Sequence, residues 1–414
     1  MPSRSFVALS MVLAAALAAC GPAAGGLVAG VTEPPPPRSR TTSSDVVVPA
    51  DAERYSFADS IGSPHAATRD ELGLQALRRL CPTRDTALER VAQRIARRQA
   101  RGLRPLETPE IVFALRAEGS PHVWPHAWAL QDADPQDAEA RARLTRFLES
   151  FHDGGERRCG VAYAEAGGRR ALAAVAVDAL ADLQPMRTRA RAGAWIGVHA
   201  LLVAEATDAQ IVVLGPNRPP YTLVTGTNDG QIRGKFAVDR PGTWLVQVLV
   251  ASERGPRPAL ESVVYVDEEP PEIFLGRPAP GEEHAARELA PAEAMHHMLQ
   301  AVRRQAGLPA LRRDARLDAL ATSHADAMRD AEQLAHDVGG GDPRRRAEEA
   351  GLAGAAVGED VAHASSVERA HRAFWASPSH RSNLLHPRFD AIGIGVASGR
   401  DRSVWVCLLF ADFR

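Results

Sequence analysis

The sequence predicts an α+β protein of three folded modules, with a β-rich module between two modules that mix helices and strands. At 414 residues the chain is too long for one hydrophobic core. Short β-rich runs separated by turn residues occupy residues 190–269. A helical pattern that begins near residue 84 returns near residue 313, which indicates that the two outer modules are related.

The first 20 residues are typical of a secretory signal that ends in a lipoprotein cleavage box. Arg4 precedes an apolar run over residues 6–16, and the segment ends in Leu17-Ala18-Ala19-Cys20-Gly21. The run is shorter than the about 20 residues that a membrane-spanning helix needs. We therefore expect Cys20 to be the acylated first residue of the mature chain and to bind the membrane. The alternative is an ordinary signal peptide, cleaved near Ala18-Ala19 without acylation.

Residues 21–69 are predicted to form a tether between the anchor and the folded modules. Their first part is rich in Gly, Pro, Ser and Thr, including the run Pro34 to Pro37, and it has no helical or strand period. Gly21 follows the acylated Cys, and by resemblance to Gram-negative lipoproteins this favours the outer membrane. The predicted location is therefore the cell envelope, outside the cytoplasm, on the periplasmic or surface face of an outer membrane if the source is Gram-negative.

The charge balance excludes a nucleic-acid-binding protein. Lys and Arg number 49 against 51 Asp and Glu, which gives a net charge of −2. Almost all of the positive charge is Arg, because Lys235 is the only lysine. No basic stripe with interleaved aromatic residues marks a nucleic-acid surface, so no nucleic-acid partner is expected.

The outer modules share one helical signature and two weaker strand signatures. We predict that residues 70–185 are a degenerate copy of the C-terminal module, whereas coincidence among Ala- and Arg-rich helices is the alternative. Nothing in residues 100–155 reproduces the polar motifs of the C-terminal module, so this copy is expected to be a scaffold or a surface for a protein partner. The matches are Arg84-Asp85-x-x-Leu88-x-x-x-Ala92-x-x-x-Ala96 with Arg313-Asp314-x-x-Leu317-x-x-x-Ala321-x-x-x-Ala325, residues 159–162 with 394–397, and residues 180–183 with 410–413.

Residues 190–269 are predicted to be an immunoglobulin-like β-sandwich, and residues 270–290 a linker. Turn signals such as Asn228-Asp229-Gly230 separate the runs at the spacing of a sandwich. No catalytic constellation lies in this module. The predicted strands are 195–203, 209–214, 221–224, 232–238, 243–250 and 262–266.

Three cysteines remain after Cys20. An exported protein permits disulfides, and Cys81 and Cys159 are the natural pair because both belong to the first module. Cys407 lies in an apolar strand pattern, so a buried free thiol is expected there rather than a nucleophile.

The C-terminal module contains the polar motifs that point to a site. A helix over 292–306 is followed by a second helix in which His324 lies beside the apolar stripe, as a packed core histidine would. His336 comes just after that helix, followed by Gly358-Glu359-Asp360 and a helix over 366–375. Ser377-Pro378-Ser379-His380-Arg381 is the most specific motif, and the strand pattern over 392–396 follows it.

These motifs resemble the bacterial branch of the CAP superfamily, which comprises the cysteine-rich secretory, antigen 5 and pathogenesis-related proteins. The resemblance covers about 120 residues and implies an α-β-α sandwich over residues 291–414. It also implies that His336, Glu359 and His380 face one cleft. Asp360 replaces the Asn of the family motif, which removes an amide donor. The second Glu that many relatives carry after a Trp is absent, because Ala376 follows Trp375.

We expect the cleft to bind a divalent cation or an apolar or envelope ligand without turnover. Two neutral imidazoles, His336 and His380, together with Glu359 are residue types that hold a cation such as zinc. A metal-dependent hydrolase acting on peptide or envelope polymer is the competing hypothesis. Ser379 beside His380 is better explained by a turn or helix-capping role than by nucleophilic catalysis. A third hypothesis is a purely structural envelope scaffold that binds protein partners through residues 70–269.

Overall fold

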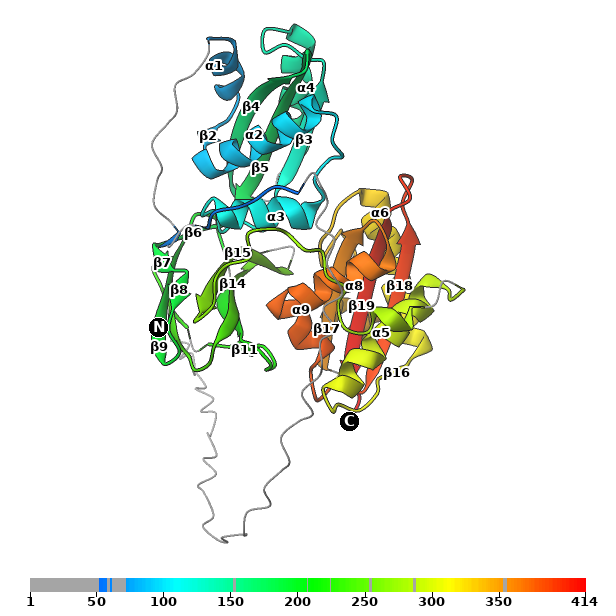
Figure 1. Cartoon of the computed structure of the whole chain (residues 1–414). Helices are drawn as coiled ribbons and strands as arrows, with labels where there is room; N and C mark the ends of the chain where they lie inside the picture. Colours follow the sequence, from blue (N-terminus) through cyan, green and yellow to red (C-terminus); the bar gives the residue numbers. More distant parts are fainter. Residues whose placement is uncertain are drawn as a thin grey trace, which may run out of the picture. The chain divides into compact units, whose positions relative to one another are not determined.

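The computed structural model shown in Figure 1 describes residues 52–57, 60–61, 72–151, 154–206, 208–223, 225–252, 255–285, 288–352 and 356–414. The predicted signal peptide, Cys20 and most of the predicted tether lie outside these residues. Within the described ranges, none of the helices combines the length and apolar character needed to span a bilayer.

The N-terminal module is a four-stranded sheet with helices on both faces. Strand order is β2-β4-β5-β3, and β2 is parallel to β4 while the other pairs are antiparallel. The side chain of Asp85 caps α2 by accepting from the Leu88 amide at 2.9 Å. One core lies between the sheet and α2 and α3, and the other lies under α1 and α4. The elements are α1 Leu72–Arg78, β2 Thr83–Arg84, α2 Thr86–Ala100, α3 Thr108–Ala117, β3 His126–Gln131, α4 Ala138–Glu149, β4 Glu156–Ala166 and β5 Arg169–Ala179.

A disulfide joins Cys81, just after α1, to Cys159 in β4, with the Cα atoms 5.6 Å apart. Both cysteines are buried in the core beneath α1 and α4. Cys407 is free and buried in the C-terminal module.

The central module consists of two antiparallel sheets that face each other across one core. The first sheet has the order β11-β10-β14-β15-β8, with β8 added in parallel, and the second has the order β12-β13-β9-β6. The buried Trp244 lies in the core that both sheets supply. The strands are β6 Ala181–Leu183, β8 Arg189–Ala190, β9 Ala194–Leu202, β10 Asp208–Leu214, β11 Tyr221–Thr222, β12 Gly226–Asn228, β13 Gln231–Val238, β14 Gly242–Ser252 and β15 Gly255–Val266; β1 Ser60–Ile61 pairs with β7 Met186–Arg187.

The C-terminal module is the predicted α-β-α sandwich. Its sheet has the order β16-β18-β19-β17, with α6 and α7 over one face and α5, α8 and α9 over the other. Alternate residues of β18 and β19 enter the two cores, because successive side chains of a strand point to opposite faces. The elements are η1 Glu282–His284, α5 Pro291–Gln305, β16 Arg312–Arg313, α6 Ala315–Ala331, α7 Pro343–Glu349, β17 Ala356–Ala364, α8 Val367–Ala376, α9 Pro378–Leu384, β18 Ala391–Ser398 and β19 Val404–Asp412.

The two outer modules share strand order, and the pairing gives their true correspondence. In the N-terminal module, Arg84 pairs with Cys159, and in the C-terminal module, Arg313 pairs with Ile392. Cys159 therefore corresponds to Ile392. The next residues, Gly160 and Gly393, correspond in the same way. A Cβ on Gly160 would lie 2.4 Å from the Leu88 carbonyl carbon, and one on Gly393 would lie 2.1 Å from that of Leu317. Gly160 thus lets α2 lie directly on its sheet, and Gly393 does the same for α6.

Both predicted strand matches are therefore wrong in register, although the helix match holds. The match of residues 159–162 with 394–397 is shifted by two residues from the correspondence that the strand pairing gives. Gly393 and Gly395 both lie against the backbone of α6, and the sequence alone does not show which of them corresponds to Gly160. The second is wrong because residues 181–183 form β6, which pairs with β9 of the central module. The central module thus begins before residue 190. Duplication itself stays a prediction.

Candidate functional site

Three elements of the C-terminal module position the candidate residues. His336 lies in the loop between α6 and α7, Glu359 lies on β17, and His380 lies on α9. The loop begins where α6 ends at Glu332, in a left-handed conformation, and it ends where Asp342 caps α7 by accepting from the Arg345 amide at 2.8 Å.

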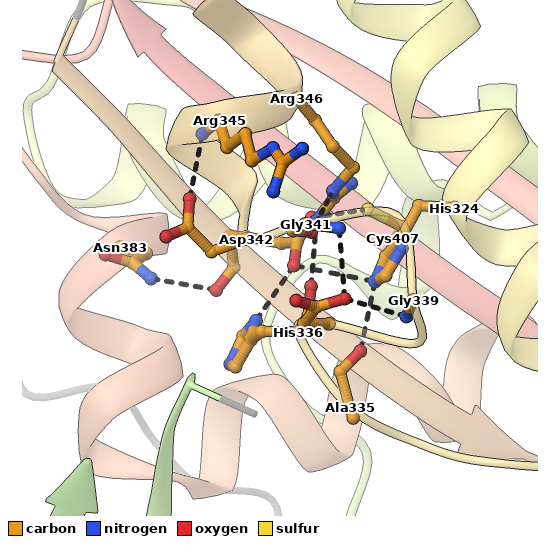
Figure 2. A network of polar contacts seen from close by, with 12 residues as sticks. His324, Ala335, His336, Gly339, Gly341, Asp342, Arg345, Arg346, Asn383 and Cys407 are labelled. Carbon is orange, nitrogen blue, oxygen red and sulfur yellow. Dashed lines mark hydrogen bonds and ion pairs between the residues drawn. The ribbon is translucent and has the colours of Figure 1, made fainter. Parts of the chain in front are cut away.

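His336 and Glu359 are joined directly. The Nδ1 atom of His336 lies 2.8 Å from Oε1 of Glu359, and Nη2 of Arg346 donates to Oε2 at 2.7 Å. The thiol of Cys407 donates to the same Oε2 at 3.3 Å. The Glu359 side chain is only 1% exposed, so these contacts replace its solvation. Figure 2 shows His336, Arg346 and Cys407 within this network of polar contacts.

The charges around Glu359 keep its carboxyl group ionised. Burial alone would raise the pKa of Glu359, but the hydrogen bond and charge of His336 and the charge of Arg346 outweigh it, and the pKa is lowered. An ionised carboxylate only accepts hydrogen bonds, so Nδ1 of His336 carries the proton. This leaves the Nε2 atom of His336 on the side of the ring away from Glu359.

Arg346 also holds the loop that carries His336. Its Nη2 donates to the His336 carbonyl at 3.1 Å, and its Nε donates to the Gly341 carbonyl at 3.1 Å. Oδ1 of Asp337 accepts from the amides of Gly339 and Gly341 at 2.7 and 3.0 Å. Gly339 and Gly341 both have positive φ, which favours glycine at these turns.

His324 is the buried core histidine that the sequence predicts. Its Nε2 lies 3.0 Å from the Ala335 carbonyl and 3.7 Å from Oε1 of Glu359. Burial lowers the pKa of His324, so the ring is neutral next to the pair. Through its contact with the Ala335 carbonyl, His324 holds the backbone just before His336. It does not add a binding group to the site.

Asp360 is fully buried beside the site and bonds to α9. Nδ2 of Asn383 donates to Oδ1 of Asp360 at 2.8 Å, whereas Oδ2 has no partner among the described residues. Burial and the nearby charge of Glu359 raise the pKa of Asp360 well above its ordinary value. A protonated Asp360 recovers the donor that the change from Asn removes.

His380 lies next to this network but is not bonded to it in the described part of the chain. Its Nδ1 is shielded from solvent and has no hydrogen-bond partner there, and its ring lies edge-on to Phe374 at 5.4 Å. Burial, followed by the charge of His336, lowers the pKa of His380 to about 3. His380 is therefore a neutral imidazole throughout the physiological pH range.

The described residues do not fit the predicted three-ligand cation site. Both oxygens of Glu359 are occupied by His336, Arg346 and Cys407, and the Arg346 cation repels a metal ion from that carboxylate. No group of three or more His, Cys, Asp or Glu side chains in the described ranges is arranged to hold a metal. Only His336 and His380 remain as candidate ligands, which is fewer than the three protein ligands of a zinc site with bound water.

No activated nucleophile accompanies the two histidines. Burial and the charge of Glu359 raise the pKa of the Cys407 thiol well above its ordinary value, so the thiol stays protonated. The Oγ of Ser379 lies 3.1 Å from Oγ of Ser377, the residue that precedes α9. Ser379 lies in the first turn of α9, whose N-cap Ser377 makes no side-chain cap bond. The predicted turn or capping role of Ser379 stays a prediction.

Sequence reasoning missed two residues of the central module that reach this region. Gln247 of β14 bonds to Ser377 and Ser379, and Gly255 of β15 lies against His336. In the sequence, Gln247 is a single polar residue within an apolar strand pattern, and Gly255 is a single glycine at a turn. Nothing local in the sequence marks a contact across modules.

One family model matches the C-terminal module. Residues 296–409 match the CAP family model, the cysteine-rich secretory protein family. No curated protein sequence matches the chain. The chain is similar to an outer surface protein of Borrelia burgdorferi, with 20% identity over 34% of this chain and 100% of that one and a TM-score of 0.29. An extracellular Bacillus anthracis protein containing an SCP domain shares 16% identity over 56% of this chain and 85% of its own, with a TM-score of 0.28. The α-β-α module around His336 and Glu359 is therefore a CAP domain.

Proposed function

We propose that the protein is exported, is held in the cell envelope by acylated Cys20, and uses its CAP domain to bind an envelope ligand without turnover. The disulfide between Cys81 and Cys159 supports export, because such bonds persist in oxidising compartments. The signal-like segment and its cleavage box support the anchor.

The observation that best supports a binding function is that both carboxylate oxygens of Glu359 already accept hydrogen bonds. Its oxygens accept from His336, Arg346 and Cys407, so the carboxylate is committed to holding the site together. A general base or nucleophile would need a free lone pair beside an oriented partner. What the pair offers is one imidazole that is held through its Nδ1 proton, which leaves the Nε2 edge of the ring to contact a ligand.

The anchor predicts that Cys20→Ser releases the protein from membranes. Several acyl chains bind a bilayer stably, at about 0.8 kcal/mol for each buried methylene, whereas an unacylated chain has no such anchor. Cells fed an alkyne fatty acid should label the wild-type protein but not Cys20→Ser, and the variant should move to the soluble fraction. Labelling that persists in Cys20→Ser would contradict the anchor.

Binding can be tested by sedimentation with peptidoglycan sacculi and, separately, with phosphatidylethanolamine and phosphatidylglycerol vesicles. We expect residues 21–414 to sediment with one of these and His336→Ala/His380→Ala to lose at least tenfold in affinity, about 1.4 kcal/mol. His284→Ala is the matched control, because the His284 side chain is 43% exposed and lies outside the site.

The same incubations separate binding from catalysis. Release of soluble sugar or peptide from sacculi, or of fatty acid from vesicles, that is lost in the double variant would support the hydrolase instead. Sedimentation that is equal in wild type and double variant would remove the cleft from the proposed function and favour the structural scaffold.

A further inference from the structure

The central module contacts the loop of His336 directly. Gly255, the first residue of β15, has φ of +99°, and a Cβ built on it would lie 2.9 Å from Cβ and 3.3 Å from Cδ2 of His336. The backbone of β15 therefore lies in van der Waals contact with the imidazole side chain. A ligand approaching His336 from this direction meets the strand first.

Gln247 of β14 contacts the other histidine-bearing element. Its side chain is fully buried, and its Nε2 donates to Oγ of Ser377 at 3.2 Å. Its Oε1 accepts from the Ser379 amide at 3.1 Å. Ser377 and Ser379 form the start of α9, one turn of chain that also carries His380. One strand pair thus contacts both segments of the candidate site.

The sheet face around Gln247 is buried although it points away from the core of the sandwich. Val212 pairs with Gln247, and Val263 lies on the same face; both are buried but neither belongs to the sandwich core. Helix α9 contacts β10 and β14 on this side. The part of this face on β10 and β14 therefore packs against the CAP domain, whereas Val263 lines a pocket with Phe57 and Arg116.

Glu261, a buried acidic side chain on this face, is paired with a cation. Nε2 of Gln247 also donates to Oε1 of Glu261 at 2.6 Å, and Arg116 of α3 pairs with the other oxygen of Glu261. Glu261 can therefore be buried at the interface without leaving an unpaired charge. The contact runs from the N-terminal module through Glu261 and Gln247 to α9.

We propose that β14 and β15 are a built-in cover of the CAP site, which hold the His336 and His380 segments closed until α9 separates from Gln247. The inference rests on the site named in the proposed function, and it adds how access to that site is controlled. The hydrogen bonds of Gln247 set the closed state. A ligand or partner that replaces them opens the site.

The cover can be tested by the rate at which diethyl pyrocarbonate modifies each histidine, followed by peptide mass spectrometry on residues 21–414. Gln247→Ala removes the bonds to Ser377 and Ser379, and we expect the rate at His336 to rise about tenfold, as loss of one or two hydrogen bonds implies. Ser377→Ala removes one of them and should give a smaller rise. Gln231→Ala, in the other sheet, should give none.

Two further histidines make the result unambiguous. His284 is exposed and should react at one rate in every variant. His371 is fully buried in α8, with Nε2 2.8 Å from the Pro280 carbonyl, and reacts only if the domain unfolds. A rise at His336 without one at His371 supports the cover. Unchanged rates at His336 in Gln247→Ala and Ser377→Ala, or rises shared by His371 in both, would overturn it. No ligand is needed, so failure of the proposed binding function leaves this result intact.

Discussion

Arg346→Ala is expected to lower the local free energy of unfolding of the CAP sheet by about 3–5 kcal/mol, the loss that follows removal of one partner of a buried ion pair. The variant leaves Glu359 buried without its cation and frees the carbonyls of His336 and Gly341. Hydrogen exchange of β17 and β19 amides measures this free energy within one module of a multi-module chain.

The chain offers a matched control one residue away. Arg345 pairs with Glu349 at 2.8 Å, but the two side chains are 70% and 60% exposed. Arg345→Ala should therefore change the same free energy by no more than about 0.5 kcal/mol. Arg346→Ala/Glu359→Gln should recover part of the loss, because no buried charge is left unpaired. Equal, small effects of Arg345→Ala and Arg346→Ala would show that the network does not stabilise the site.

Asp360→Asn is expected to stabilise the CAP domain at neutral pH by about 1–3 kcal/mol, the cost of a buried polar group that is imperfectly satisfied. The folded pKa of Asp360 is raised by burial, so the fold holds a proton that the unfolded chain releases above about pH 3.9. Stability from this group is fully present below that pH and is lost as pH rises through the folded pKa. Asparagine supplies both an acceptor oxygen and a donor group without titrating.

The pH dependence distinguishes this effect from simple repacking. The advantage of Asp360→Asn, measured by exchange of the β17 amides, should shrink as pH falls from 7 to 4, because both states of the wild type then carry the proton. Asp401→Asn is a suitable control, since the pKa of Asp401 is lowered by its hydrogen bonds to Ser403. An advantage of Asp360→Asn that stays constant with pH would contradict the raised pKa.

The elements of the CAP domain could be predicted because their signals are local. The helix predicted over residues 292–306 matches α5, and the one predicted over 366–375 matches α8. Apolar periodicity carries this information, together with Pro291 at the start of α5 and the capping side chain of Ser366 before α8. The pairing of His336 with Glu359 is a contact between distant segments, so only resemblance to a known family suggested that the two residues meet.

Register and contacts across modules could not be predicted. Gly393 and Gly395 have the same sequence context, and only the pairing of β16 with β18 shows which one corresponds to Gly160. Gln247 and Gly255 contact the site from another module, through the face of a sheet whose burial depends on what packs against it. A binary pattern of polar and apolar residues does not specify the partner of such a face.

The positions of the three thiols also bear on how the chain acquires its disulfide. Cys81 and Cys159 belong to the first module, whereas Cys407 belongs to β19, the last strand. In a chain that is threaded out of the cell from its N-terminus, the first two thiols meet oxidants well before the third emerges. Once β19 is paired, Cys407 is buried against Glu359 and protected from exchange. In such a chain the order of emergence would favour the pairing of Cys81 with Cys159.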